Sequence, residues 1–377
     1  MSAEAAIGAD DDRVGERGVS PREPIAGGVG PSQGPTLIDP QARVIDYLRV
    51  SVTDRCNYGC SYCIPHDGVA HADRADVLSF EEIAALVRVF VSLGVRRVRL
   101  TGGEPTVRRD LPALVRLLRA IPGLADIALS TNGHLLSELA APLRAAGVDR
   151  VNISLDSLDP ERFRRITRRG ELPRVLAGIE AARAAGFASI KLNTVAIRGF
   201  NDDEFDRISG WAWERGLVPR FIEEMPMADG RAYLPGAHMP AAEIRRRIAA
   251  AWPGTEAVAD DDAPSPVRGA GPARYFRLEP DGGGAPAATP ARRFGVISPM
   301  TEHFCTTCNR LRLSTAGALH ACLAYDDAVD LRGPLHAGGA DAVAGAIRGA
   351  LAGKRPGHTF QLIGLGGPRK AMVQIGG

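Results

Sequence analysis

The sequence predicts a barrel-like parallel β-sheet of six strand–helix units, short of the eight strands of a closed barrel. Two observations support this fold class. Segments rich in β-branched and apolar residues alternate with segments of helical periodicity, and the strand-like segments end in polar or glycine-rich residues. Strand–helix alternation implies right-handed crossovers and a parallel sheet. In barrels of this kind the carboxyl ends of the strands carry the active site, so we expect the chemistry there.

The first strand–helix unit has the clearest signals. Residues 47–54 have the composition of a buried strand, and residues 79–94 have the pattern of a helix. Ser79 is the expected N-cap, Glu82 completes a capping box, and Gly94 is the expected stop. The same alternation then gives strands at 95–103, 126–133, 148–156, 189–195 and 218–227, with helices at 110–121, 135–147, 172–186 and 202–216.

Each of the six predicted strands ends in polar residues or glycines. One or two polar ends would only mark the start of a loop, but six are less easily explained in that way. The residues concerned are Thr53, Asp54, Gly102, Gly103, Glu104, Thr131, Asn132, Ser154, Asp156, Asn193, Glu223 and Glu224.

The segments on either side of the barrel pattern differ from it. Residues 1–42 are rich in Gly, Pro and Asp and are expected to be a disordered leader. The barrel is expected at 43–253. Residues 254–377 are expected to form a smaller C-terminal domain, which begins with a Pro/Gly/Ala-rich stretch around a strand at 273–279. The arginine-rich segment 162–170 is expected to be a solvated loop.

Composition excludes several classes of protein. The chain has 377 residues, 45% of them hydrophobic, and its 46 basic and 44 acidic residues give a formal net charge of +2. This balance argues against a general nucleic-acid or membrane-surface binder, but it leaves room for a local basic pocket. No apolar run is long enough for a transmembrane helix, and the N-terminus lacks the apolar region of a secretory signal. We therefore expect a cytoplasmic protein whose thiols stay reduced.

The six cysteines form two local groups of three. The first trio is Cys56, Cys60 and Cys63, and the second is Cys305, Cys308 and Cys322. A structural zinc site needs four ligands, and a histidine near each trio is a candidate for the fourth. A 4Fe-4S cluster held by three thiolates instead keeps one iron open to another ligand. The candidate fourth zinc ligands are His66 or His71 for the first trio and His303 or His320 for the second.

The first trio and a glycine-rich motif together resemble the radical S-adenosylmethionine superfamily. The trio lies in CNYGCSYC at 56–63, after the first strand, and TGGEP at 101–105 follows the second. The resemblance implies an incomplete (β/α)6 TIM-like barrel of radical SAM type. It also implies that the amino and carboxylate groups of S-adenosylmethionine bind the open iron of a 4Fe-4S cluster. Glycines of TGGEP would then approach the methionine amine.

The second trio narrows the resemblance to one family. The stretch HFCTTCNRLRLSTAGALHACL at 303–323 closely resembles the GTP 3',8-cyclases of molybdenum cofactor biosynthesis, and the likeness runs from Leu48 to the terminal QIGG. It implies a second 4Fe-4S cluster, in the smaller C-terminal domain, whose open iron binds the guanine of GTP. Departures from the family pattern are Gly59 where Arg is frequent, Ile64 where Met is frequent, and Ser130 where Thr is frequent.

The resemblance also implies roles for individual residues. Contacts to S-adenosylmethionine fall on Tyr62, Gly103, Ser154 and Met225, and contacts to GTP fall on Arg49, Arg99, Ser130 and Lys191. Arg97 and Arg220 would lie near the triphosphate. Arg310 and Arg312 would flank the second cluster and the nucleotide. Catalytic roles fall on Arg310, Arg312, Gly376 and Gly377, and the six cysteines are the cluster ligands.

The implied enzyme is a lyase that binds GTP and uses S-adenosylmethionine and two 4Fe-4S clusters. A 5'-deoxyadenosyl radical would take the 3' hydrogen of GTP, and the product would be 3',8-cyclo-7,8-dihydroguanosine 5'-triphosphate. Implied partners are an electron donor such as flavodoxin or ferredoxin and the downstream cyclic pyranopterin monophosphate synthase, with a homodimer left open. We expect the clusters to face each other across the barrel mouth. The alternatives are a radical enzyme with another substrate, such as a peptide, and a zinc-bound structural protein.

Overall fold

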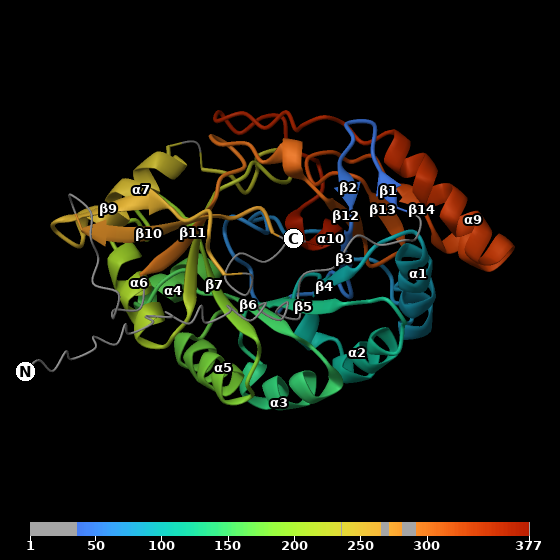
Figure 1. The fold of residues 1–377 in the computed structure, drawn as a ribbon, viewed down its shortest axis with the longest axis horizontal. Coiled ribbons are helices and arrows are strands. Elements are labelled where there is room, and N and C mark those ends of the chain that lie inside the picture. Colours follow the sequence, from blue (N-terminus) through green and yellow to red (C-terminus); the bar gives the residue numbers. More distant parts are fainter. Residues whose placement is uncertain (1–35, 235, 265–270, 281–291, 377) are drawn as a thin grey trace, which may run out of the picture. The chain divides into compact units, whose positions relative to one another are not determined.

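A computed structural model describes residues 36–234, 236–264, 271–280 and 292–376. All of these lie in one compact unit, Ser32–Gly377. Its main feature is a twelve-stranded sheet in the order β14-β13-β12-β3-β4-β5-β6-β7-β8-β11-β10-β9. Helices cover the outer face of this curved sheet (Figure 1). The strands are β1 (Leu37–Ile38), β2 (Val44–Ile45), β3 (Tyr47–Ser51), β4 (Arg97–Thr101), β5 (Asp126–Thr131), β6 (Arg150–Ser154), β7 (Ser189–Ala196), β8 (Val218–Glu223), β9 (Thr255–Ala259), β10 (Arg274–Pro280), β11 (Arg293–Ile297), β12 (Arg310–Leu313), β13 (Ala318–His320) and β14 (Val329–Asp330).

The six strands from β3 to β8 pair in parallel and in chain order. This confirms the incomplete (β/α)6 barrel. The helices are α1 (Phe80–Ser92), α2 (Leu111–Arg119), α3 (Leu136–Ala146), α4 (Pro160–Thr167), α5 (Leu172–Ala184), α6 (Phe205–Glu214), α7 (Ala241–Ala250), α9 (Arg332–Ala352) and α10 (Met372–Ile375). The capping box of α1 forms as expected, because the Ser79 side chain accepts from the Glu82 N–H and the Glu82 carboxylate accepts from the Ser79 N–H.

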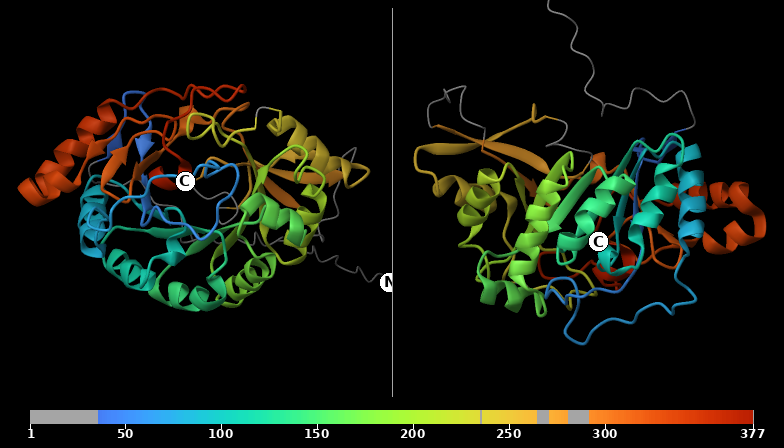
Figure 2. Two further views of the ribbon diagram at one scale, coloured as in Figure 1. Left: turned by 180° about the vertical axis from the view of Figure 1, so that it is seen from behind. Right: turned by 90° about the horizontal axis from the view of Figure 1, so that it is seen from below.

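Two strands from the second half of the chain extend the parallel sheet. β12 pairs in parallel with β3, and β11 pairs in parallel with β8. The predicted domain boundary at residue 253 remains a prediction, although the second half of the chain shares the sheet of the first. In the right view of Figure 2, the gold and orange strands β9 and β10 project beyond the green barrel strands.

Strand alternation separates an apolar outer layer from a polar interior. Leu48 and Val50 on β3 belong to the hydrophobic core packed against the helices, whereas Tyr47 and Arg49 line an interior cavity. Successive side chains of a strand point to opposite faces, so one short strand serves both purposes. The polar lining is therefore a property of the whole barrel interior and not only of the strand ends.

Two predicted segments differ from the structure. Most of the predicted leader, residues 1–35, lies outside the described residues, but 36–42 contribute β1, which pairs with β2. The segment 162–170, expected to be a loop, begins inside the helix α4. Asp159 caps this helix and Pro160 is its first residue, and both are helix-start signals that outweighed the run of arginines.

Candidate functional site

The first cysteine loop follows β3 and packs directly on the glycines that follow β4. The Gly103 N–H donates to Thr53 O at 2.7 Å, and the Glu104 N–H donates to Arg55 O at 2.9 Å. A Cβ on Gly102 would lie 2.2 Å from Thr53 O, and one on Gly103 would lie 2.3 Å from Arg55 O. Only glycine permits this approach, so the TGG segment fixes the backbone that leads into the first trio.

The carboxyl end of α4 holds the same loop from the other side. The Gly59 N–H donates to Thr167 O, and the Ser61 N–H donates to Ile166 O, both at 3.0 Å. Arg168 Nη1 donates to the carbonyl oxygens of Ile64 and Pro65. The loop carrying Cys56, Cys60 and Cys63 is therefore held on both sides by main-chain hydrogen bonds.

The second trio is held by two buried cations. Arg43, on the β1–β2 turn, donates to Cys305 O at 2.7 Å and to Pro356 O at 3.0 Å. Lys354 Nζ donates to Arg310 O at 3.2 Å and to Ala321 O, and it lies 4.0 Å from the Cys308 sulfur. These side chains, which come from distant parts of the sequence, connect the segments that carry Cys305, Cys308 and Cys322.

The two trios lie at opposite ends of the barrel interior. Cys308 comes just before β12, whose first residue, Arg310, is in register with Tyr47 at the start of β3. Cys56 comes after Ser51, where β3 ends. Five residues at about 3.3 Å each separate the two ends by roughly 16 Å. The expectation that the trios face each other across one mouth was therefore wrong, since they face each other along the interior.

Arginines from three neighbouring strands form one row between the trios. Arg312 on β12 is in register with Arg49 on β3, which is in register with Arg99 on β4. Lys191 on β7 and Arg220 on β8 also line the cavity, which has a volume of about 350 Å³. Five cations from five strands thus surround one interior space.

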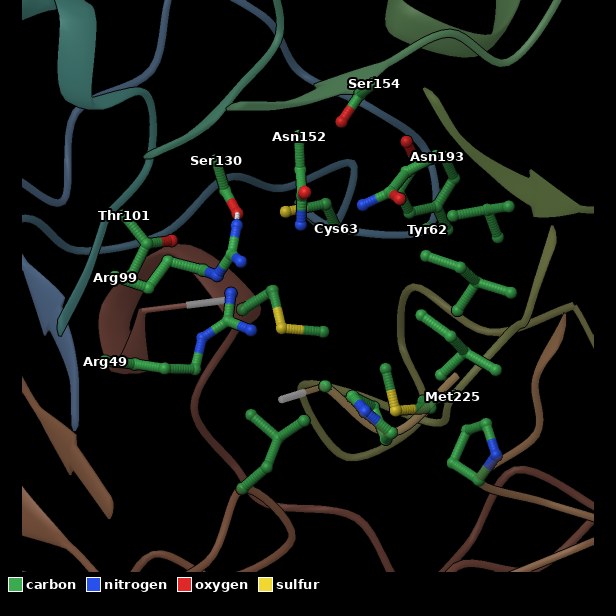
Figure 3. Close-up of a pocket in the computed structure, with 18 of the residues that line it drawn as sticks. Arg49, Tyr62, Cys63, Arg99, Thr101, Ser130, Asn152, Ser154, Asn193 and Met225 are labelled. Carbon is green, nitrogen blue, oxygen red and sulfur yellow. Dashed lines mark hydrogen bonds between the residues drawn. The ribbon is translucent and has the colours of Figure 1, made fainter. Parts of the chain in front are cut away.

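Two of these cations donate hydrogen bonds to neutral side chains. Arg99 donates to Tyr47 Oη and to Ser130 Oγ, and Arg220 donates twice to Asn193 Oδ1, at 2.6 and 3.0 Å. The Lys191 ammonium lies over the Tyr275 ring. In Figure 3 the Arg49, Arg99 and Ser130 side chains lie on one side of the cavity. The other side carries Tyr62, Ser154, Asn193 and Met225.

Burial lowers the pKa of several of these cations. The pKa of Lys191 lies well below its usual value, first because of burial and then because of Arg220 and Arg99. Burial and the neighbouring Arg310 lower the pKa of Arg312 to about 10. A site that disfavours its own positive charges in this way favours an anion with several negative charges.

Buried carboxylates surround the cavity near the first trio. Asp156 accepts from Tyr62 Oη at 2.6 Å and from the Val195 N–H. Glu223 accepts from the N–H groups of Ala241, Met300 and Thr301. Glu224 follows it and is 2% exposed. Burial raises the pKa of Glu224 to about 8.

The C-terminal tail reaches the row of arginines. Arg312 Nη1 donates to Gly376 O, which makes the tail a direct neighbour of that row. Gly376 has φ of 75°, and a Cβ there would lie 3.1 Å from Ser51 Cβ and 3.3 Å from Thr101 Cγ2. Gly377 lies outside the described residues, so its predicted role has no structural counterpart here.

Comparison with known proteins assigns both halves of the chain. Residues 50–212 match the radical SAM superfamily model, and residues 218–360 match the Molybdenum Cofactor Synthesis C model. A GTP 3',8-cyclase of Rhodopseudomonas palustris is 44% identical over 328 residues, which cover 86% of this chain and 90% of the relative. One of Moorella thermoacetica is 46% identical over 336 residues, which cover 89% and 98%. The chain belongs to the GTP 3',8-cyclase family.

This chain resembles the solved structure of SuiB less closely than it resembles these relatives. SuiB of Streptococcus suis bound to S-adenosylmethionine aligns with a TM-score of 0.45 and 15% identity, over 54% of this chain and 47% of SuiB. That likeness is too low to support an inference about function.

Family membership implies two 4Fe-4S clusters, and the donor set fits them. All six cysteines are free thiols, and all six line the same cavity. Over the described residues, no group of three or more His, Cys, Asp or Glu side chains is suited to a single metal ion. Two of the histidines proposed as zinc ligands have other partners. His71 lies 3.6 Å from Asp54, and His303 contacts Pro299 O and His358.

The structure brings most of the predicted GTP 3',8-cyclase site residues to the cavity. Gly376 does not line it, although Gly376 accepts a hydrogen bond from Arg312, and Arg97 does not line it either. That side chain forms an ion pair with Asp46 at the other end of β4 and does not line the cavity. The predicted residues that do line it are Arg49, Tyr62, Arg99, Gly103, Ser130, Ser154, Lys191, Arg220, Met225, Arg310, Arg312 and the six cysteines.

Sequence reasoning missed several lining residues. Tyr47 and Asn152 face the interior because they alternate with buried apolar neighbours on β3 and β6. That alternation was visible in the sequence and could have identified them. His358 and Phe360, which also line the cavity, gave no such signal, because they lie in an irregular segment.

Proposed function

We propose that this chain is a radical S-adenosylmethionine GTP 3',8-cyclase. In this proposal it converts GTP to 3',8-cyclo-7,8-dihydroguanosine 5'-triphosphate for molybdenum cofactor biosynthesis in the cytoplasm. The observation that carries the proposal is the set of buried cations between two cysteine trios. A triphosphate with several negative charges satisfies such a set, and guanidinium groups bind phosphate oxygens in pairs.

The substrate end of the site is assigned to the cation row. Arg49, Arg99 and Lys191 hold the triphosphate, with Arg220 beside them and Ser130 Oγ as a further hydrogen-bond partner. Arg312 is the member of the row on β12, and Arg310 lies two residues nearer the second trio, so these two arginines orient the guanine end. The buried position of the row keeps water from the bound nucleotide.

The cofactor end is assigned to the first trio and its surroundings. Cys56, Cys60 and Cys63 hold one 4Fe-4S cluster, and Cys305, Cys308 and Cys322 hold the other. Tyr62, Gly103, Ser154 and Met225 position S-adenosylmethionine. When bound, the first cluster and S-adenosylmethionine supply the adenosyl radical chemistry that removes the 3' hydrogen.

The tail is assigned a positioning role at the row of arginines. Arg312 Nη1 donates to Gly376 O, so the tail and the guanidinium orient each other. Such a contact limits the number of geometries in which the nucleotide can be bound. Gly377, which lies outside the described residues, is proposed to share this role in the reaction.

Anaerobic incubation of the reconstituted chain with GTP, S-adenosylmethionine and dithionite tests the proposal. We expect 5'-deoxyadenosine together with a cyclised nucleotide of the same mass as GTP but a different retention time, identified by mass spectrometry after separation. Deoxyadenosine without a nucleotide product would favour a radical enzyme acting on another substrate. A colourless zinc protein after anaerobic iron reconstitution would contradict the assignment altogether.

A further inference from the structure

The outer face of α4 carries a group of exposed arginines that the proposed reaction does not use. Arg164 and Arg165 lie on the helix, and Arg168 and Arg169 follow its end. All four are exposed, and within the described ranges none forms an ion pair with an acidic side chain. We call these four residues the α4 arginine patch. It is a local concentration of charge in a chain whose formal net charge is only +2.

Arginines on either side of the patch have acidic partners. Arg162 pairs with Asp203 and lies 3.4 Å from Glu204, and Arg174 lies 3.5 Å from Glu171. The charges of these two arginines are therefore balanced within the chain. The patch between them is not balanced in this way, which leaves its charge available to a partner.

The inner face of the same helix reaches the first trio. Phe163 and Thr167 line the cavity, and Thr167 O accepts the Gly59 N–H inside the cysteine loop. Arg168, at the edge of the patch, donates to the carbonyls of Ile64 and Pro65, next to Cys63. An α-helix with its side chains is about 10–12 Å across. Arg164 and Arg165 are therefore about the thickness of one helix from the first trio, and Arg168 is closer because it contacts the cysteine loop itself.

A structural role explains only part of the patch. Basic side chains near a helix C-terminus interact favourably with the helix dipole, which accounts for Arg164 and Arg165. Arg165 also stacks over the Phe200 ring, with 5.3 Å between the guanidinium carbon and the ring centroid. Arg169 lies beyond the helix, and neither role applies to it.

We propose that the α4 arginine patch is the docking surface for an acidic protein that carries single electrons. The inference rests on the proposed function, since reductive cleavage of S-adenosylmethionine consumes one electron at the first trio. The donor is oxidised by one electron, the first cluster is reduced by one, and no group is transferred. Complementary charge steers such encounters and fixes their orientation.

A binding measurement tests the surface without relying on turnover. Reduced or oxidised ferredoxin, an acidic carrier, is titrated with the reconstituted chain at low ionic strength. Arg164→Glu/Arg169→Glu should weaken binding by about tenfold or more. The matched control is Arg88→Glu/Arg348→Glu on α1 and α9, which reverses two exposed arginines without ion pairs in the described part of the chain. These helices lie on the right in Figure 1, and α4 lies on the left.

A turnover measurement separates this inference from the proposed function. With reduced ferredoxin as donor, the α4 double variant should form deoxyadenosine about tenfold more slowly, and added salt should slow the parent chain toward the same rate. With dithionite, parent and variant should be equally fast, because a small reductant needs no docking surface. If dithionite gives no product in the parent chain, the proposed function fails, while the binding result still decides the docking surface.

Several outcomes would overturn the docking proposal. They include ferredoxin affinity that does not change with salt in the parent chain, equal weakening in the control variant, or a rate loss that appears with dithionite as well. Tight binding of a single-stranded oligonucleotide with unchanged ferredoxin affinity would assign the patch to nucleic acid instead. If Arg164→Glu/Arg169→Glu loses iron, the neutral variant Arg164→Gln/Arg169→Gln replaces it. The binding of ferredoxin to that variant, and the salt dependence of binding to the parent chain, then test the proposal.

Discussion

At the scale of single residues, Lys191 shows how a binding site can oppose the stability of the fold that contains it. The residue is 5% exposed and shares the interior with Arg99 and Arg220. Lys191→Met should weaken GTP binding by about 10- to 100-fold, the value of a charged hydrogen bond of about 1.5–3 kcal/mol. It should also raise the free energy of unfolding of the empty chain by on the order of 1 kcal/mol, because a buried cation is removed.

Equilibrium dialysis with GTP and urea unfolding of the same preparations check both parts of this prediction. Arg348→Met, on the exposed surface of α9, is the control and should change neither quantity. Unchanged GTP affinity for Lys191→Met would remove Lys191 from the nucleotide site.

Glu224 gives the chain a pH dependence of known sign. Burial raises the pKa of Glu224 to about 8 from an ordinary value of 4.5, so the folded chain keeps a proton that the unfolded chain loses in that range. The free energy of unfolding should therefore fall as pH rises from 4.5 to 8, by about 1.4 kcal/mol for each unit of pKa difference. Glu224→Gln should make this slope shallower, and the part that remains comes from Asp156, whose pKa burial raises to about 6. Thermal unfolding of the two empty chains from pH 4 to pH 9 measures it, and parallel curves would contradict the assignment.

At the scale of elements, local signals were predictable and long-range pairing was not. The capping box of α1 was read correctly because Ser79 and Glu82 are three residues apart. The pairing of β12 with β3 joins residues more than 250 positions apart, and no local pattern specifies that register. The row formed by Arg312, Arg49 and Arg99 depends on that pairing, so the sequence could suggest its members but not their adjacency.

The role of the C-terminal tail in GTP conversion can be tested with a change at a single residue. Gly376→Ala should leave iron content and S-adenosylmethionine binding unchanged, because both trios lie elsewhere. It should lower GTP conversion by about tenfold, since the new methyl group would press on Ser51 and Thr101 and shift the contact to Arg312. Gly186→Ala is the matched control. Its φ of 70° imposes similar backbone strain of about 1–2 kcal/mol, but nothing lies within 4 Å of the new Cβ.

Product formation, iron content and GTP affinity of these two variants form one comparison, and deletion of residues 376–377 extends it to the part of the tail outside the described residues. A turnover loss equal in both variants would mean that backbone strain alone is responsible. Lost iron in Gly376→Ala would make the tail a structural element of a cluster site.

At the scale of the whole molecule, a single sheet holds two metal sites apart while exposing both to one cavity. The fold class and the two cysteine trios were predictable, because the spacing of the cysteines and the hydrophobic periodicity of the strands and helices are properties of short segments of the sequence. The placement of the trios at opposite ends of the interior was not predictable, because it depends on β12 joining β3 at its starting edge. The polar interior that connects them follows from strand alternation once the register is known.

This separation predicts that the two ends can be disabled independently. Replacing Cys56, Cys60 and Cys63 with Ala should halve the roughly eight irons expected for two 4Fe-4S clusters and abolish cleavage of S-adenosylmethionine. GTP affinity should stay within about twofold of the parent, because the row of arginines and the second trio, which hold the nucleotide in this proposal, keep their own contacts. Cys322→Ala should do the reverse, with weaker GTP binding and some uncoupled cleavage of S-adenosylmethionine.

Iron analysis, GTP dialysis and deoxyadenosine formation on both variants and on their combination complete this test. If loss of the first trio also weakens GTP binding strongly, the two ends are coupled through the row of arginines, and the interior acts as one unit. If Cys322→Ala binds and cyclises GTP at the parent rate, the second trio is not a substrate site. Independent losses that add in the combined variant are expected, because each trio is held by its own contacts, Gly59 and Ser61 with α4 at one end and Arg43 and Lys354 at the other.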